Sequence, residues 1–162
     1  MKAIRARETY ERAGVYYVRT EAMVYGFGVS LQGEFDGDTP DSDYILVTDD
    51  NGAPLSTCRV HFVPEEGYAK IERVATVSFA RGIGAGRLAI EAAEEWIREK
   101  GYKKIIITSR DEAVGFYEKL GYTADYTKDV RTLFPSPKKN DASKENEESR
   151  PKFVIVYVEK NL

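Results

Sequence analysis

The sequence predicts a single domain of the α+β class. Three observations support this prediction: strand-like runs joined by turn signals between residues 44 and 77, a long amphipathic helical pattern that ends at Gly101, and an uninterrupted apolar run from Ile105 to Ile107. A chain of 162 residues can bury most of its apolar surface around one core without disulfides or metals. We therefore assign residues 1–162 to one domain.

Composition argues against several classes of protein. The net charge of −3 offers no excess of positive charge for nucleic acid. Cys58 and His61 are the only residues of their types, so neither an intramolecular disulfide nor a zinc site is expected, and no metal is predicted. No apolar run reaches the roughly 18 to 20 residues of a membrane span, and the N-terminal residues lack the apolar core of a signal peptide. We expect a cytoplasmic protein without a nucleic-acid or membrane partner.

The first elements are expected to be a short strand, a helix and a loop. The opening MKAIRARE fits a strand, and residues 8–25 carry apolar side chains at mostly helical spacing. Residues 26–43 are rich in Gly, Asp, Ser and Pro, which indicates a loop with at most one helical turn.

Three strands follow as a predicted antiparallel meander. Residues 44–48 form an apolar run of strand length, and the Asn-Gly dipeptide after them favours a tight turn into a second strand at residues 55–63. The sequence PEEG then turns the chain into a third strand at residues 68–77. Strict alternation along that third strand predicts two opposite faces, with Glu72, Val74 and Thr76 on one and Arg73 and Ala75 on the other.

The second half of the chain alternates between helices and strands. The long helix has apolar pairs every four residues and a glycine cap, and the isoleucine run after it suits a central strand covered on both faces. Ser109 and Glu112 form a predicted capping box for a second helix, which Gly121 ends.

The C-terminal segments are expected to form a hairpin with a long connection. A strand is predicted at residues 122–126, and residues 152–160 return as the final strand. Between them, residues 135–151 are polar, mixed in charge and free of large apolar side chains, which indicates a mobile loop.

The turn before the long helix contains three glycines within five positions, Gly82, Gly84 and Gly86. A strand, a glycine-rich turn and a helix N-terminus together favour the binding of phosphate. The phosphate loop of nucleotide hydrolases needs G-x-x-x-x-G-K-[ST], which is not met here. The looser dinucleotide pattern G-x-G-x-x-A is met by Gly84, Gly86 and Ala89, so spacing alone leaves it open, but the upstream meander is not the βαβ unit that it requires.

The same residues carry a resemblance to a known family. The stretch from Arg81 to Gly86 meets the acyl-CoA signature [QR]-x-x-G-x-[GA], and IERVATVSFARGIGAG and AVGFYEKLGY resemble the two signatures of the GCN5-related N-acetyltransferase (GNAT) family in the right order. The resemblance covers residues 55–126 well. It implies a mixed, mostly antiparallel sheet flanked by helices, with a V-shaped split between the strand that ends at Val77 and the one that starts at Lys103.

The resemblance also implies where acetyl-CoA, the expected cosubstrate, would bind. Main-chain groups of Val74, Ala75 and Thr76 would pair with its pantetheine arm. The pyrophosphate would lie on the backbone amides of the glycine turn, with added charge from Arg81 or Arg87. These amides belong to Gly82, Ile83, Gly84, Ala85, Gly86 and Arg87. The competing interpretation is a turn whose glycines serve packing alone.

Two catalytic residues are implied in the same way. Tyr117 matches the tyrosine that donates a proton to the departing thiolate in many members, although it also lies on an apolar helical stripe. Glu72 matches a glutamate that takes the proton of the acceptor amine, although a cross-strand ion pair or plain solvation is a competing interpretation. Arg110 stands where the family often has an asparagine, which is a departure from its pattern.

The implied function is an acetyl-CoA-dependent N-acetyltransferase that acts on a primary amine of a small molecule or peptide. A non-catalytic acyl-CoA-binding protein is the alternative, and a covalent acyl-enzyme on Cys58 is a third. The stretch EFDGDTPDSD, which starts at Glu34, would suit a cationic acceptor if it is not merely solvated. A homodimer is left open.

Overall fold

The described part of the chain folds around one central sheet. The computed structural model describes residues 1–135 and 152–162, and within them seven strands pair in the order β1-β2-β3-β4-β5-β7-β6. The strands are β1 (Lys2–Ala6), β2 (Asp43–Thr48), β3 (Pro54–Val63), β4 (Tyr68–Thr76), β5 (Lys104–Arg110), β6 (Thr123–Asp125) and β7 (Ile155–Asn161). All neighbours are antiparallel except β4 and β5, which are parallel. This arrangement confirms the predicted fold class.

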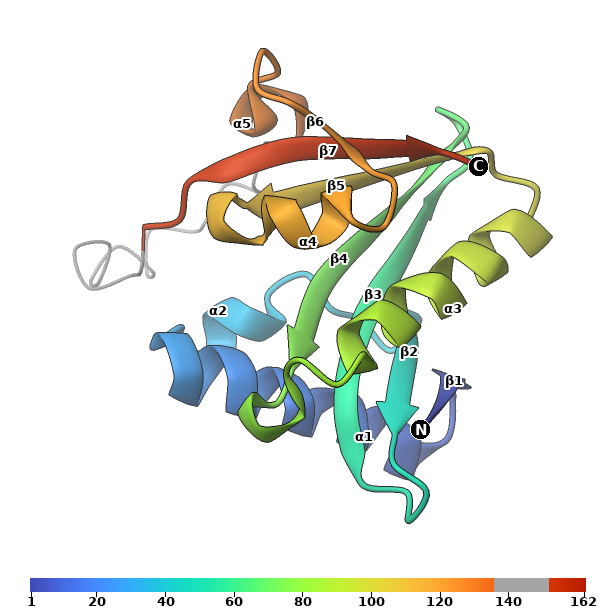
Figure 1. Cartoon of the computed structure of the whole chain (residues 1–162), viewed down its shortest axis with the longest axis vertical. Helices are drawn as coiled ribbons and strands as arrows, with labels where there is room; N and C mark the ends of the chain where they lie inside the picture. The colour runs from blue at the N-terminus through green and yellow to red at the C-terminus, as the bar shows by residue number, and fades with distance from the viewer. Residues whose placement is uncertain (136–151) are drawn as a thin grey trace.

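Helices cover both faces of the sheet (Figure 1). They are α1 (Thr9–Arg19), the π-helix η1 (Thr20–Tyr25), α2 (Leu31–Phe35), η2 (Ser78–Ala80), α3 (Ala85–Glu99), η3 (Asp111–Ala113), α4 (Val114–Glu118) and α5 (Val130–Leu133). The long helix α3 lies on one face of β2 and β3, and α1 lies on the other. Within the described ranges, none of these helices is long and apolar enough to cross a membrane.

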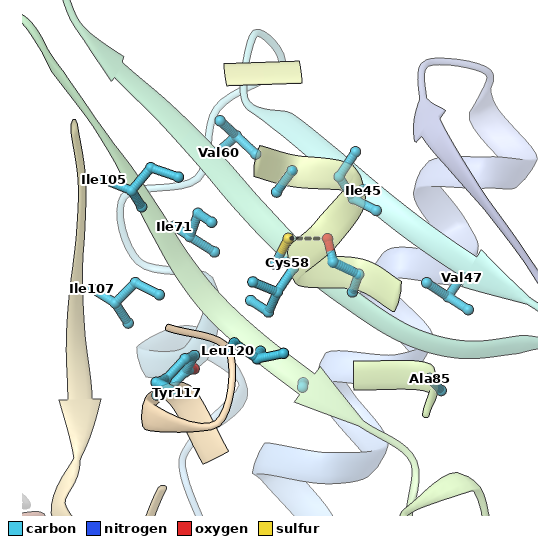
Figure 2. Packing of buried hydrophobic residues seen from close by; sticks show 14 of the residues in the cluster. Ile45, Val47, Cys58, Val60, Ile71, Ala85, Ile105, Ile107, Tyr117 and Leu120 are labelled. Atoms are coloured by element: carbon cyan, nitrogen blue, oxygen red, sulfur yellow. Dashed lines mark hydrogen bonds between the residues drawn. The ribbon is translucent and has the colours of Figure 1, made fainter. Parts of the chain in front are cut away.

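Successive side chains of β2 point to opposite faces of the sheet, and both faces are covered by helices. Leu46 packs with Val15 of α1, whereas Ile45 points to the opposite side and joins the main core cluster with Ile90 of α3. The Cys58 thiol of β3 belongs to the same cluster and donates a weak hydrogen bond, 3.7 Å long, to the carbonyl of Ala89 (Figure 2). The meander and α3 therefore form one packed unit that fixes the turn between β4 and α3.

β4 and β5 are hydrogen-bonded only at their beginnings. The register pairs Ala69 with Ile105 and Lys70 with Ile106, and no later pair is formed. Beyond this point the two strands run apart, as Figure 1 shows. This is the split that the sequence led us to expect between these two segments.

The alternation predicted for β4 is wrong because the strand contains a β-bulge. The register moves from Arg59↔Glu72 to Thr57↔Ala75, so β4 holds one residue more than β3 over this interval. Arg73, in the bulge, has a φ of 51°, in the left-handed region. Cross-strand partners share a face, so Glu72 lies on the face of Ala75 and not on that of Thr76.

The predicted capping box at Ser109 and Glu112 is also wrong. Ser109 is still in β5, where it pairs with Val156, and its hydroxyl donates to the carbonyl of Arg110 at 2.8 Å. The strand extends because β7 supplies partners as far as Arg110. The helical segment consequently starts later and is short, with η3 leading into α4.

The C-terminal hairpin is confirmed. β6 and β7 pair antiparallel, from Thr123↔Glu159 to Asp125↔Tyr157. The predicted mobile loop at residues 135–151 lies outside the described residues, apart from Pro135.

Candidate active site

The turn before α3 and the first residues of that helix, residues 81–87, form a glycine-rich backbone segment, which we call the cradle. Gly82 and Gly84 have φ values of 78° and 90°, a conformation that residues with a Cβ rarely adopt. A Cβ built on either glycine would meet no heavy atom within 4 Å, so the space beside them is open. Gly86 differs, because its Cβ would lie 3.3 Å from the Thr76 hydroxyl oxygen. All three glycines thus have a backbone or packing reason to be there.

The cradle presents backbone donors that the helix does not use. Leu88 donates to the Gly84 carbonyl at 3.0 Å, and the N–H groups nearest the start of a helix have no partner within it. They lie at the N-terminal end of α3, which is the positive end of the helix dipole. Such an arrangement fits a pyrophosphate group.

The free edge of β4 leads from the cradle into the split. Val77 N–H donates to Leu55 of β3 at 3.0 Å, so the N–H and C=O of the preceding residue, Thr76, point to the other side. There β5 has already separated from β4. Thr76 and Val74 therefore offer main-chain groups to an extended ligand, while Ala75 accepts a hydrogen bond from Ser56 on the β3 side.

Tyr117 is a buried side chain of α4. It is 5% exposed and packs edge to face against Phe116 and Tyr122. Figure 2 shows it with Leu120 at the end of the core cluster near Ile107. Burial raises the pKa of the Tyr117 phenol well above its usual range, so the hydroxyl keeps its proton at neutral pH.

Glu72 lies in an ion-pair cluster on the α1 side of the sheet. Arg59, its cross-strand partner, approaches one carboxylate oxygen at 2.9 Å, and Lys70 approaches the other at 3.0 Å. Burial tends to raise the pKa of the Glu72 carboxyl, but the charges of Lys70 and Arg59 outweigh it and the net pKa is lowered. Glu72 is therefore a carboxylate at neutral pH, and the cross-strand ion pair that we had weighed is formed.

The cluster continues into α1 and α2 through residues that the sequence analysis missed. Arg19 is fully buried and binds Glu34 at 3.0 Å and Asp38 at 2.7 Å. Asp38 also contacts Arg59 at 3.2 Å and accepts a hydrogen bond from Tyr44. Two of the five acidic residues of the 34–43 stretch are thus buried ion-pair partners, which removes much of the support for a cationic acceptor.

Asp38 should make stability depend on acid pH. Burial opposes its ionisation, but hydrogen bonds from Arg19 and Tyr44 and the charge of Arg59 lower the pKa of Asp38 to about 2. An unfolded Asp titrates near about 3.9, so the ionised side chain stabilises the fold above that pH and the contribution is lost between about pH 4 and pH 2. We expect Asp38→Asn to flatten this part of the profile of urea midpoint against pH. Asp36→Asn, in the exposed turn, is the control and should leave it unchanged.

Two hollows adjoin these residues. One of about 300 Å³ lies between η1 and the cradle, where Tyr25, Phe27 and Arg81 line it. The other, an open groove of about 670 Å³, lies between α1 and the segment around α2, with Asp38 in its lining. Cys58 faces neither; burial raises the pKa of its thiol to about 12, so it lacks the reactive thiolate that an acyl-enzyme would need.

Comparison with known proteins places these features in one family. The sequence matches the model of the acetyltransferase (GNAT) family over residues 5–122. YjcF of Bacillus subtilis (strain 168), named as an uncharacterized N-acetyltransferase, is 30% identical over 122 residues, which cover 75% of this chain and 85% of that protein. Among solved structures, one from Lactobacillus plantarum, assigned to an N-acetyltransferase, has a TM-score of 0.78 and 27% identity over 99% of this chain and 97% of that chain.

A more distant structure shares the fold and holds coenzyme A. It is a Mycobacterium tuberculosis protein solved in complex with CoA, with a TM-score of 0.59 and 14% identity over 77% of this chain and 73% of that chain. The region matched by the family model includes β4, the cradle and Tyr117, which are the main parts of the candidate site. The protein is an acyltransferase, and its chain belongs to the acetyltransferase (GNAT) family.

Proposed function

We propose that the protein transfers an acetyl group from acetyl-CoA directly to a primary amine of a small molecule or a peptide. The observation that supports this most strongly is the continuity of three features: an open cradle of unused backbone donors, a free strand edge beside it, and a split between parallel strands. An extended thioester with a pyrophosphate at one end matches that sequence of groups.

The residues of the cradle and of β4 would hold the cosubstrate. The amides of residues 82–87 would bind the pyrophosphate, and the exposed Arg81 and Arg87 would add positive charge beside it. Val74 and Thr76 would pair with the pantetheine amides as a neighbouring strand would, while Ala75 keeps its bond to β3. Bound acetyl-CoA supplies an activated acyl thioester.

Tyr117 and Glu72 would manage the two protons of the transfer. The amine nitrogen attacks the thioester carbonyl carbon and the carbon–sulfur bond breaks. Tyr117 gives its hydroxyl proton to the sulfur as negative charge develops there. Glu72, anionic and paired with two cations, is a weak base, so we assign it to orienting the amine and receiving its proton through water.

Tyr117→Phe and Glu72→Gln test these roles. We expect each variant to lower kcat by about 10²-fold or more, because proton transfer is lost, while the Kd for acetyl-CoA stays within a factor of three. Release of free CoA thiol over an amine panel measures the first quantity, and calorimetry measures the second. Wild-type protein that binds acetyl-CoA but modifies no amine would support the non-catalytic alternative. Unchanged turnover in Tyr117→Phe would remove that residue from the mechanism.

A further inference from the structure

The ion-pair cluster around Glu72 contains one more positive than negative charge. Its members are four cations, Arg19, Arg59, Lys70 and Arg73, and three carboxylates, Glu34, Asp38 and Glu72. All of them lie at the junction of α1, the α2 segment, β3 and β4. A surplus charge in a half-buried cluster is costly unless water or a ligand compensates it.

The surplus is located on Arg73. Arg19, Arg59 and Lys70 each lie within 3.0 Å of a carboxylate oxygen. Among the described residues, Arg73 approaches a single carboxylate oxygen, Glu34 Oε2, at 3.7 Å, which is too long for a hydrogen bond. That oxygen is buried and has no hydrogen-bond partner among the described residues. The Arg73 side chain is 35% exposed, so solvent or a ligand can reach its guanidinium.

The backbone at Arg73 is held in an unfavourable conformation. Its φ of 51° is the only positive value at a residue other than glycine within the described ranges. Residues other than glycine, asparagine and aspartate rarely adopt this conformation, and those that retain it often lie at functional sites. Glycine or asparagine would relieve the strain, yet the chain has a long cationic side chain here, one residue from Glu72.

A second arginine, Arg110, lies on β5, across the split from the ion-pair cluster. It ends β5 four residues after Ile106, and Ile106 is the cross-strand partner of Lys70. Because side chains alternate along a strand, Arg110 and Lys70 lie on the same face of the sheet. Its guanidinium is 4.1 Å from the Phe27 ring centre and 5.3 Å from that of Phe153. Arg110 Nη1 forms an ion pair with Glu112 at 3.5 Å but has no hydrogen-bond partner among the described residues.

We propose that the acceptor is an amine that also carries an anionic group, a carboxylate or a phosphate, and that Arg73 binds that group. This inference rests on the proposed function and names the class of its acceptor. Arg73 supplies a planar pair of donors that suits either anion. Glu72, beside it, attracts the ammonium end of the same molecule. Glu34 and Asp38, the two carboxylates of the acidic 34–43 stretch that belong to the cluster, do not oppose an anion, because they are already paired with arginines.

The test compares matched acceptors in Arg73→Asn, Arg73→Lys and wild type. Asparagine tolerates the left-handed backbone and removes the charge, while lysine keeps the charge without the fork of donors. The acceptors are L-leucine with L-leucinamide, β-alanine with β-alaninamide and phosphoethanolamine with ethanolamine, and spermidine represents polycations. Arg98→Asn, on the exposed side of α3, removes the same charge far from the site.

We expect the wild-type protein to prefer the anionic acceptor of each pair. In Arg73→Asn the KM for the anionic acceptor should rise at least about 10-fold, while kcat and the KM for the neutral acceptor stay within a factor of three. Arg73→Lys should recover part of the loss, and Arg98→Asn should behave as wild type. The leucine and phosphoethanolamine pairs separate carboxylate from phosphate. Preference for spermidine or for the neutral members, or equal effects on both members, would overturn the inference.

A binding measurement separates this inference from the proposed function. The Nε–H resonance of Arg73, assigned from its disappearance in Arg73→Lys, should shift on addition of the anionic member and not of the neutral one. If that shift occurs but no amine is acetylated, the transferase proposal fails and the anion site stands. If amines are acetylated but the Arg73 resonance does not shift, the transferase proposal stands and the anion site at Arg73 is rejected.

Discussion

Gly84→Glu should abolish the binding of acetyl-CoA, with an increase in Kd of at least about 100-fold. The substitution puts a Cβ on a backbone with a φ of 90° and a carboxylate into the open space beside the cradle. A negative charge placed against a pyrophosphate costs several kcal/mol, and every 1.4 kcal/mol is a factor of ten in affinity. Calorimetric titration with acetyl-CoA and with free CoA measures the loss.

Gly52→Glu is the matched control for backbone strain. Gly52 lies in the β2–β3 turn with a φ of 85°, and a Cβ there would also meet nothing within 4 Å. Both variants therefore introduce similar backbone strain, but only Gly84→Glu adds a negative charge to the cradle. If both variants lost acetyl-CoA binding, backbone strain and not the added charge would explain the loss. If wild type itself fails to bind acetyl-CoA, the proposal that acetyl-CoA is the cosubstrate should be withdrawn.

The parts of the fold that the sequence predicted correctly are those with local causes. The Asn-Gly turn, the apolar pairs of α3 and the glycine cap at Gly101 are each set by neighbouring residues, and each is found in the structure. The end of β5 and the face of Glu72 depend instead on pairing with distant strands. A bulge in β4 changed the face of Glu72, and pairing of β5 with β7 as far as Arg110 moved the start of the helix; neither can be recognised from the pattern of a single strand.

In the candidate site, too, the residues with local causes could be predicted and those that depend on distant partners could not. The cradle could be predicted because three glycines and a helix start lie within a few residues. Arg19 could not, because a charged residue near the end of an amphipathic helix ordinarily faces solvent. Its partners lie 15 and 19 positions away in a segment that reads as a loop. The sequence offers only an acidic stretch, which is compatible with a solvated loop as well as with a surface for a cationic acceptor.

Replacing Arg19 should produce the largest loss of stability of any single substitution considered. Its guanidinium is 0% exposed, binds both Glu34 and Asp38, and donates to the Glu34 carbonyl at 2.7 Å. Arg19→Met keeps a long apolar side chain but leaves two carboxylates without their main partner. Breaking a buried ion pair from one side costs about 3–5 kcal/mol, so we expect the urea midpoint to fall accordingly with little change in m-value.

Two further variants separate loss of charge pairing from loss of packing. Arg98→Met, on the exposed face of α3, should change the free energy of unfolding by less than about 0.5 kcal/mol. Arg19→Met combined with Glu34→Gln and Asp38→Asn removes the two carboxylates that Arg19→Met leaves without their main partner, so it should recover part of the loss, because those charges are no longer buried without compensation. If the triple variant is no more stable than Arg19→Met alone, packing against Phe35 and not charge is what Arg19 contributes.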